Sequence, residues 1–439
     1  MTKLFGTDGV RGPVGEVVTG ELALALGRAA AAMSPAEAPQ VLIVRDTRES
    51  GEMLEASLAA GVAAGGGHAL LGGVLPTPGA ALLVRRYGLD LAAVVSASHN
   101  PYADNGIKFF GPDGMKVSDE LEARIESVVA GSEPPPERPM GRVRELHGAP
   151  GDYLRELELR FRDLDLSGRR VLLDCAHGAT HRVAPEIFRR LGAEVDAVGA
   201  SPDGRNINDG YGSTHVDSLA GRVAEGSYDV GFAFDGDGDR VLAADRGGTV
   251  VDGDELLALA ALHLRGAGRL TGDGVAVTVM TNYGFHTAMA EHGIEVEVTP
   301  VGDRHVLAAL VKQGWALGGE QSGHIIDTGF VPSGDGTASA LLTLEALKGG
   351  DLADRHAMEK LPQRLVNVKV ADRGALEGAT AVRNAMEAES KALEGRGRVL
   401  IRPSGTEPLV RVMVEAPGEE ECEAVTARLV AVVQRELGA

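Results

Sequence analysis

The sequence predicts an α/β protein in which three related domains precede a smaller α+β domain. The first evidence is a set of three short apolar stretches, each followed by a polar turn and an amphipathic helix. These stretches are Val41–Val44, Val171–Leu173 and Val275–Val279. The second is that each helix ends at glycine, a common helix stop, before another strand-like segment. The third is that a further helix, a strand and a polar loop complete each unit.

Three polar loops close the three units. They are the serine loop (residues 96–101), the acidic loop (235–240) and the third loop (319–324). The expected helices span about residues 50–64, 182–191 and 285–292, and the next strands span about 68–71, 193–195 and 294–296. Because any α/β protein repeats strand–helix units, an unrepeated arrangement stays open on periodicity alone. The recurrence of a polar loop at one place favours related domains whose loops converge.

Chain length and three breaks in composition divide the sequence into four segments. Its 439 residues exceed one ordinary core, so about two to four domains are expected. The breaks are the Gly/Pro-rich stretch 131–136, the turn at 246–249 and the segment Leu361–Gln363. We expect α/β domains at 1–150, 151–250 and 251–362, which carry the serine, acidic and third loops respectively. Residues 363–439 alternate strands and helices as a small α+β domain does.

Charge and cysteine usage exclude several classes of protein. The chain has 43 Lys and Arg residues against 63 Asp and Glu residues, and its formal net charge is −20. This charge argues against nonspecific binding to nucleic acid or anionic membranes, which need a basic face. Cys175 and Cys422 are the only cysteines, too few for a disulfide framework or a cysteine zinc cluster. No signal-peptide pattern or membrane-length apolar stretch occurs, so we expect a cytoplasmic protein without membrane or nucleic-acid partners.

The serine loop holds a candidate nucleophile. Ser98 follows the apolar stretch Leu91–Val95, so a buried strand ends in small polar residues at the rim of a sheet, where ligands bind. A bare serine is a weak nucleophile that needs activation or a phosphoryl group to relay. A turn serine is the alternative, because the Asn-Pro pair that follows is itself a turn signal. The hairpin signal Asn105-Gly106 favours a site, because it returns Lys108 toward Ser98.

The acidic loop predicts a divalent-metal site. It places Asp235, Asp237 and Asp239 at alternate positions, separated by glycines that let the backbone curl. Hard divalent cations prefer such carboxylate oxygens. An EF-hand is excluded, because its sixth position, which must be glycine, is arginine here. The alternative, a solvated acidic turn, would leave three charges crowded and unpaired after an apolar strand. With Ser98, the loop indicates a phosphorylated serine beside a carboxylate-bound metal.

Two further polar segments suit a phosphorylated sugar. The third loop sets Glu320, Ser322 and His324 between glycines, where they could meet sugar hydroxyls; a flexible polar loop is the alternative. The segment Arg402–Pro408, followed by Arg411, combines arginines, hydroxyls and glycine as an anion nest does, with an ordinary turn as the alternative. No lysine follows a glycine in the chain, so a Walker motif is absent and nucleotide use is unsupported.

Five motifs together resemble the α-D-phosphohexomutase family. They are Phe5–Gly12, Ser96–Pro101, Asp235–Arg240, Gly319–His324 and Arg402–Pro408. They occur in the order of the family and span the chain. The resemblance implies four domains around a central cleft: three related α/β domains of three layers and a smaller C-terminal α+β domain. The repeat pattern predicts three such units independently.

The resemblance also implies a role for each candidate residue. The implied catalytic residues are Ser98, which would carry the phosphate, and Arg11, His99 and Lys108. The implied ligands of one Mg²⁺ per chain are the phosphate on Ser98 and the carboxylates of Asp235, Asp237 and Asp239. The implied substrate-binding residues are Arg240, Asp303, Arg304, Glu320, Ser322, His324, Arg402, Ser404, Gly405, Thr406 and Arg411.

The first and fourth motifs are similar to the bacterial branch that acts on glucosamine phosphates. This implies interconversion of glucosamine 6-phosphate and glucosamine 1-phosphate through glucosamine 1,6-bisphosphate, in supply of UDP-N-acetylglucosamine and peptidoglycan precursors. The implied partner is a phosphosugar, and a homodimer is allowed. A phosphoglucomutase/phosphomannomutase is the near alternative. A non-catalytic phosphosugar-binding protein is the distant one, which predicts loss of Ser98 or an aspartate, and all four residues are present.

Overall fold

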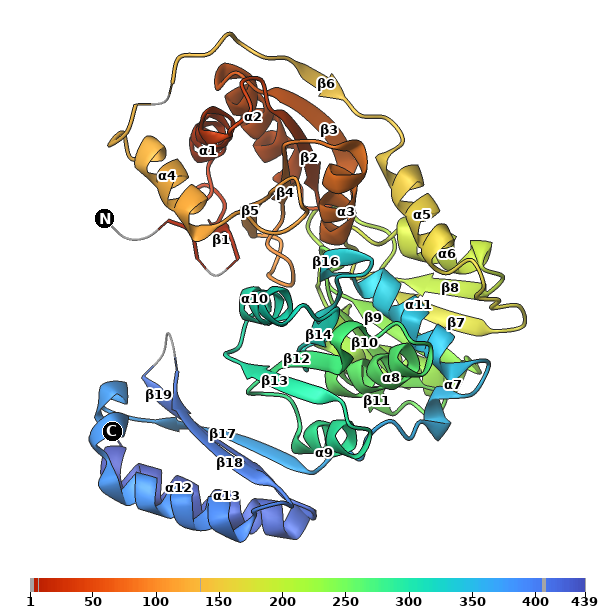
Figure 1. Ribbon diagram of the computed structural model, residues 1–439, viewed down its shortest axis with the longest axis vertical. Helices are drawn as coiled ribbons and strands as arrows, with labels where there is room; N and C mark the ends of the chain where they lie inside the picture. Colours follow the sequence, from red (N-terminus) through yellow and green to blue (C-terminus); the bar gives the residue numbers. More distant parts are fainter. Residues whose placement is uncertain (1–3, 7, 135, 405–407, 439) are drawn as a thin grey trace. The chain divides into compact units, whose positions relative to one another are not determined.

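Two compact units make up the structure. The computed structural model describes residues 4–6, 8–134, 136–404 and 408–438. The first unit comprises Met1–Val279 and Glu295–Arg355, and the second comprises Met280–Ile294 and His356–Ala439. Within the described ranges, the first unit holds three β-sheets and the second holds one (Figure 1). This arrangement confirms the predicted fold class of three α/β sheets followed by a smaller α+β domain.

The first sheet mixes parallel and antiparallel strands. In spatial order, it contains β1 (Val10–Pro13), β5 (Asp104–Phe110), β4 (Leu91–Val95), β2 (Gln40–Arg45), β3 (His68–Val74) and β6 (Val143–Glu145). Its helices are α1 (Gly20–Met33), α2 (Gly51–Ala64), α3 (Thr77–Tyr87) and α4 (Asp119–Val129). Helices α1, α2 and α4 pack together over one face and α3 over the other (Figure 1). Strand β5 returns antiparallel along β4 and sets Lys108 opposite Val94, so Lys108 returns toward Ser98 as predicted. The prediction of a turn at Asn105-Gly106 is wrong, because both residues lie inside β5 and pair with β1.

The second and third sheets repeat the same strand–helix order. The second contains β11 (Val250–Val251), β10 (Val241–Asp245), β9 (Val230–Phe234), β7 (Arg170–Asp174) and β8 (Glu194–Val198). The third contains β13 (Glu295–Thr299), β12 (Gly274–Thr278), β14 (Leu317–Gly319), β15 (Ile325–Asp327) and β16 (Val331–Gly334). Their helices are α5 (Ala149–Arg160), α6 (Val183–Arg190), α7 (Val216–Gly226), α8 (Gly253–Gly266), α10 (Asp303–Gln313) and α11 (Gly336–Leu347).

The repeat places the three polar loops at equivalent positions. In each sheet the strand before the loop pairs in parallel with the first strand of the unit: β4 with β2, β9 with β7 and β14 with β12. The predicted strands and helices are confirmed, including the glycines after α6 and α9 (Tyr283–Glu291), where Gly192 and Gly293 adopt positive φ. Parallel strands end at one edge of a sheet, so each loop emerges at the edge where α/β ligand sites form.

Side-chain caps fix where the helices of the site begin. Asp252 starts α8 with a capping box to Glu255, and Asp335 starts α11 by accepting a hydrogen bond from the amide of Ala338. Each cap satisfies an amide that the helix leaves unpaired and holds the strand-to-helix turn in place. Helices α8 and α11 therefore each begin at a fixed residue directly after a strand.

The second unit is a three-stranded antiparallel sheet covered by helices. Its strands, in spatial order, are β17 (Gln363–Lys369), β19 (Leu409–Glu415) and β18 (Arg398–Pro403). Helices α12 (Thr380–Ala392) and α13 (Glu419–Leu437) lie side by side over one face (Figure 1). Helix α9 belongs to this unit, and the amide of Tyr283 donates a 2.9 Å hydrogen bond to Glu415. The core is built from Val410, Val412 and Leu429.

None of the helices in the part of the chain that the structure describes is both long and apolar enough to cross a bilayer. Cys175 and Cys422 are buried free thiols.

Candidate active site

Ser98 lies at the end of β4 with its hydroxyl against the acidic loop. Its side chain is buried, and Oγ donates a 2.5 Å hydrogen bond to Oδ2 of Asp235. The Nδ1 atom of His99 lies 3.3 Å from the same Oγ. The equivalent ends of β4 and β9 thus bring the predicted nucleophile and the predicted metal ligand together.

The backbone of Ser98 adopts a left-handed conformation and is closely packed. Its φ is +51°, which is unusual for a residue with a side chain. A Cβ on Gly236 would lie 2.5 Å from the Ser98 carbonyl oxygen, so only glycine lets the acidic loop approach this closely. Strained backbone at a buried hydroxyl is a feature of functional sites.

The acidic triad (Asp235, Asp237 and Asp239) can hold a metal ion. All three side chains are buried, and one oxygen from each lies within 4.8 Å of the others. The Oδ1 atoms of Asp237 and Asp239 are buried and have no hydrogen-bond partner among the residues that the structure describes. Unsatisfied carboxylate oxygens that face one point fit a hard divalent cation.

The pKa values of the triad carboxylates are shifted in different directions. Burial, followed by the charges of Asp239 and Asp237, raises the pKa of Asp235 well above its usual value. Burial and the charge of Asp239 oppose ionisation of Asp237, but the charge of Lys108, with hydrogen bonds from Lys108 and Thr77, lowers the pKa of Asp237. The Lys108 Nζ atom lies 2.7 Å from Oδ2 of Asp237 and 3.6 Å from Oδ2 of Asp239. Although burial disfavours its charge, Asp237 and Asp8 raise the pKa of Lys108, so it stays cationic.

Positive groups surround the triad on its other sides. Arg11 on β1 forms an ion pair with Asp8, which also lies 3.7 Å from Lys108. The amide of Arg240 donates to Oδ1 of Asp235, and its Nε lies 4.0 Å from Oδ1 of Asp239. Burial, then Arg240 and Arg11, lowers the pKa of His99, so its imidazole is neutral near pH 7. These cations supply the local positive field that an anionic substrate needs against the net charge of the chain.

The third loop places a buried histidine and an exposed serine at the edge of the third sheet. His324 is buried, with Nδ1 3.7 Å from Oδ1 of Asp239. The amide of Gly334 donates to Nε2 of His324, an arrangement that puts the imidazole proton on Nδ1, facing Asp239. Glu320 is buried and accepts a 3.0 Å hydrogen bond from Gly302, whereas Ser322 is exposed.

Asp303 and Arg304, at the start of α10, form ion pairs with charged side chains at and just before α4 of the first domain. Oδ2 of Asp303 lies 2.5 Å from Nζ of Lys116 and 3.8 Å from His324. Arg304 forms ion pairs with Asp119 and Glu122, the second at 2.6 Å. Their predicted role in substrate binding stays a prediction.

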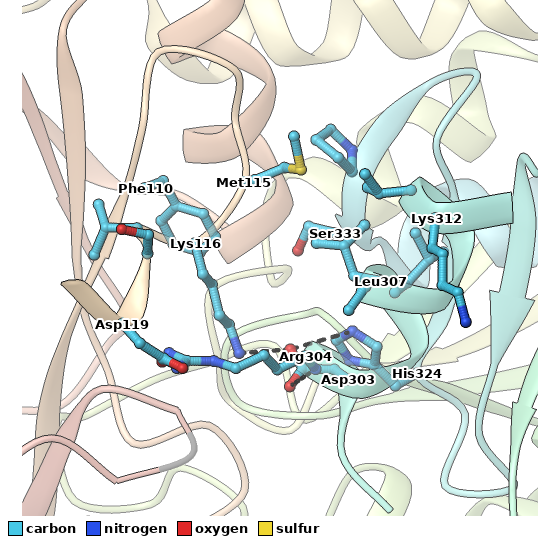
Figure 2. Close-up of a pocket in the computed structure, with 16 residues that line it drawn as sticks. Phe110, Met115, Lys116, Asp119, Asp303, Arg304, Leu307, Lys312, His324 and Ser333 are labelled. Carbon is cyan, nitrogen blue, oxygen red and sulfur yellow. Dashed lines mark hydrogen bonds and ion pairs between the residues drawn. The ribbon is translucent and has the colours of Figure 1, made fainter. Parts of the chain in front are cut away.

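A cavity of about 380 Å³ opens beside this charged group. Figure 2 shows Lys116 extending toward Asp303 and His324, and all three residues line the cavity. Its walls are largely apolar and include Phe110, Met115, Leu307, Ile326 and Pro332. The cavity therefore combines largely apolar walls with a charged group formed by Lys116, Asp303 and His324.

The C-terminal phosphate-binding candidates lie in the second unit. Strands β18 and β19 set Arg402 directly opposite Arg411. Burial and the charge of Arg411 lower the pKa of Arg402. Neither guanidinium has an ion pair with a residue that the structure describes. Ser404, two positions after Arg402 in the sequence, is buried. Gly405 and Thr406 lie outside the described residues. Two neighbouring arginines that pair with no carboxylate of the described residues favour a bound anion.

Three residues of the charged site were not among the sequence candidates. Asp8 pairs with Arg11, Lys108 and Lys116, although it lies inside the first motif. Lys116 joins Asp8 to Asp303. Thr77, at the start of α3, donates a 2.6 Å hydrogen bond from Oγ1 to Oδ2 of Asp237. Only Asp8 carried a sequence signal, because Thr77 and Lys116 act through contacts between sheets.

Four domain profiles of one family match the chain in succession. They are described as phosphoglucomutase/phosphomannomutase alpha/beta/alpha domain I (residues 2–135), domain II (151–248), domain III (252–365) and the C-terminal domain (365–432).

Full-length relatives and solved structures agree with these profiles. The chain is 47% identical to a phosphoglucosamine mutase of Geobacillus kaustophilus over 100% of both chains. It is 49% identical to a phosphoglucosamine mutase of Moorella thermoacetica over 98% of each. A phosphoglucomutase/phosphomannomutase family protein from Burkholderia thailandensis has a TM-score of 0.82 at 22% identity, covering 99% of this chain and 98% of that one. Aspergillus fumigatus N-acetylphosphoglucosamine mutase, in complex with GlcNAc-6P and magnesium, has a TM-score of 0.68 at 18% identity, covering 99% and 96%.

Proposed function

This chain belongs to the phosphoglucomutase/phosphomannomutase family of phosphohexomutases, and we propose that it interconverts glucosamine 6-phosphate and glucosamine 1-phosphate. One observation carries the proposal: the Ser98 hydroxyl donates a 2.5 Å hydrogen bond to Asp235 within a buried acidic triad. The two full-length relatives that are 47% and 49% identical support glucosamine phosphate as the substrate.

The reaction we propose passes a phosphoryl group between Ser98 and the sugar. Phosphoserine 98 gives its phosphoryl group to the free hydroxyl of a bound sugar phosphate, so the bond from phosphorus to Oγ breaks and a bond to the sugar oxygen forms. The hydroxyl proton is transferred in the same step and ends on Oγ. The glucosamine 1,6-bisphosphate reorients, and Ser98 takes back the other phosphoryl group. The net reaction is an isomerisation, and the enzyme is phosphorylated again at its end.

The described residues would contribute charge, position and proton transfer. Lys108 and Arg11 would face the charge that develops on the phosphoryl oxygens. His99 is neutral and lies 3.3 Å from Oγ, so its Nδ1 can accept and return the proton. The acidic triad would hold Mg²⁺, which neutralises phosphoryl charge when bound. Arg402 and Arg411 would bind the phosphate that is not being transferred.

Two alternative functions are compatible with part of this evidence. A phosphoglucomutase or phosphomannomutase would use the same residues on a neutral hexose. A non-catalytic phosphosugar-binding protein would need no phosphorylated serine, so the intact serine and triad disfavour it. Two buried free thiols suit the reducing cytoplasm, where we place the reaction.

The deciding experiment measures mutase activity of phosphorylated protein with Mg²⁺. Glucosamine 6-phosphate, glucose 6-phosphate and mannose 6-phosphate are compared by kcat/KM. We expect a clear preference for the amino sugar; preference for a neutral hexose would overturn the substrate assignment. Ser98→Ala should lose at least about 10³-fold in kcat while it still binds sugar phosphate. Ser118→Ala, which removes a helix cap in the same domain, should retain activity.

A further inference from the structure

We propose that Arg48 is the positioning residue that holds Ser98 for phosphoryl transfer, and that Asn208 holds the same loop from the second sheet. The inference rests on the proposed role of Ser98. Arg48 follows strand β2, and its side chain is fully buried. It does not reach the acidic triad through any ion pair or hydrogen bond of the described residues.

All five N–H groups of the Arg48 guanidinium have acceptors, and four of these are backbone carbonyls of one segment. Nε donates to Oδ2 of Asp46 at 2.9 Å. Nη2 donates to the carbonyl of Ser98 at 2.9 Å and to that of Asn100 at 2.8 Å. Nη1 donates to the carbonyls of Pro101 and Asp104. One rigid planar fork thus fixes the serine loop and its exit toward β5.

Asn208 repeats two of these contacts from another part of the fold. Its Nδ2 donates to the carbonyl of Ser98 at 2.9 Å and to that of Asn100 at 3.1 Å. Asn208 itself has a φ of +61° and is held by a 2.9 Å hydrogen bond from its amide to the carbonyl of Ala176. The Ser98 carbonyl therefore accepts hydrogen bonds from the loop after β2 and from the loop after β8 together.

The amide side of Ser98 is fixed as firmly as the carbonyl side. The Ser98 amide donates to Oγ of Ser96 at 3.0 Å, and Ser96 Oγ donates to Oδ2 of Asp46 at 2.6 Å. Asp46 also accepts from Arg48, so a single buried network ends at both peptide groups of Ser98. This network explains how a residue with a side chain is held at a φ of +51°.

The role that follows is orientation of Oγ rather than contact with substrate. Every donor of Arg48 is already used inside the protein, so none is left for a phosphate. Phosphoryl transfer needs the donor oxygen, phosphorus and acceptor oxygen close to one line, and a displacement of about 1 Å can cost about 10²-fold in rate. Loosening the loop should therefore lower kcat and leave the affinity for sugar phosphate largely intact.

The test compares Arg48→Lys with Arg138→Lys. Arg138 is a matched control, because it donates to the backbone carbonyls of Ala31, Ser34 and Ala36 in the same domain, away from Ser98. Lysine keeps the positive charge beside Asp46 but has three donors and no planar fork. For Arg48→Lys, we expect kcat to fall by about 30- to 100-fold, with KM within about threefold. Single-turnover transfer from phosphoserine should slow by the same factor, whereas Arg138→Lys should keep kcat within about twofold at a similar loss in Tm.

Asn208→Gly is a second variant that removes no buried charge and suits the positive φ. We expect kcat to fall by about 5- to 10-fold, again without a matching change in KM. If both Asn208→Gly and any folded Arg48→Lys protein keep kcat within about twofold, or raise KM alone, the inference is wrong. Mass spectrometry of the wild type separates the two proposals: phosphate absent from Ser98 in an active enzyme would overturn both. Phosphate on Ser98 with silent variants would overturn only the role of Arg48 and Asn208.

Discussion

The hydroxyl of Ser98 and Oδ2 of Asp235 lie 2.5 Å apart, although 137 positions separate the two residues in the chain. Each follows the strand that pairs in parallel with the first strand of its sheet, β4 in one case and β9 in the other. The repeated strand–helix order therefore builds the site: it sets a serine hydroxyl and a carboxylate at equivalent edges, and the packing of the two sheets brings the edges together.

Thr77→Val should weaken metal binding without removing a metal ligand. The Thr77 hydroxyl donates to Oδ2 of Asp237 at 2.6 Å, and its amide donates to the Asp237 carbonyl. Partners of this kind orient ligating carboxylates, and their loss typically costs about 10- to 100-fold in metal affinity. The half-saturating Mg²⁺ concentration for mutase activity should rise by that factor. Thr77→Ser keeps the hydroxyl and should behave as wild type; equal metal dependence in the valine variant would contradict this role.

Asp235→Asn should separate metal binding from stability of the metal-free protein. Three buried carboxylates within 4.8 Å repel one another, so removing one charge should leave the metal-free Tm equal to or above that of wild type. Added Mg²⁺ should stabilise wild type, by about 2.7 kcal/mol at a hundredfold excess over Kd, and should not stabilise the variant. Thermal unfolding with Mg²⁺ and with a chelator measures both effects. Asp196→Asn, an exposed change on β8, is the control that should keep the Mg²⁺ shift.

Lys116 and Asp303 should be energetically coupled. The Lys116 ammonium lies 2.5 Å from Asp303 and also pairs with Asp8, in a largely buried position. Lys116→Met removes the nearest cation from two partly buried carboxylates, Asp8 and Asp303, and should destabilise the protein by about 3 kcal/mol. Asp303→Asn in the same chain should restore part of that loss.

A double-mutant cycle in urea measures this coupling, which should exceed about 1 kcal/mol. The exposed pair Arg190 and Glu186 serves as a control and should give less than about 0.5 kcal/mol. A Lys116 cycle as small as the exposed one would show that the ion pair contributes nothing to stability.

Much of the fold follows from local pattern in the sequence. The apolar stretch before each polar loop forms the expected strand, and Lys108 returns along β4 as expected, although Asn105-Gly106 lies within β5 and the turn precedes it. Ser98 and the acidic triad were predictable for the same reason, since each lies directly after a buried strand. Their convergence depended on the repeat and was expected only because polar loops recur at one place.

The remaining residues could not be found by local pattern, because their roles depend on contacts between sheets. Thr77 and Lys116 stand in ordinary turn and hairpin positions, and only packing against Asp237 and Asp303 gives them a function. Arg48 did have a signal, because Asp46-Thr47-Arg48 follows β2 as Ser98 follows β4. The rule that polar residues at strand ends mark a site would have found it.

Asp335→Asn should change how stability depends on pH. Burial raises the pKa of Asp335 to about 7, although the Ala338 amide and the Tyr153 hydroxyl donate to it and oppose that rise. An unfolded aspartate has a pKa of about 3.9, so between about pH 4 and pH 7 the folded protein binds more protons and its stability falls as pH rises. Asparagine keeps the cap of α11 and has no charge to bury. The free energy of unfolding of the variant minus that of wild type should therefore increase by about 1 kcal/mol per pH unit within that window and level off above it. Tyr153→Phe removes a donor to the charged form of Asp335 and should move this pH window to higher pH.

Urea unfolding of the wild type and the two variants at a series of pH values measures the difference in free energy of unfolding. A difference that stays constant with pH would show that Asp335 is already ionised at pH 5.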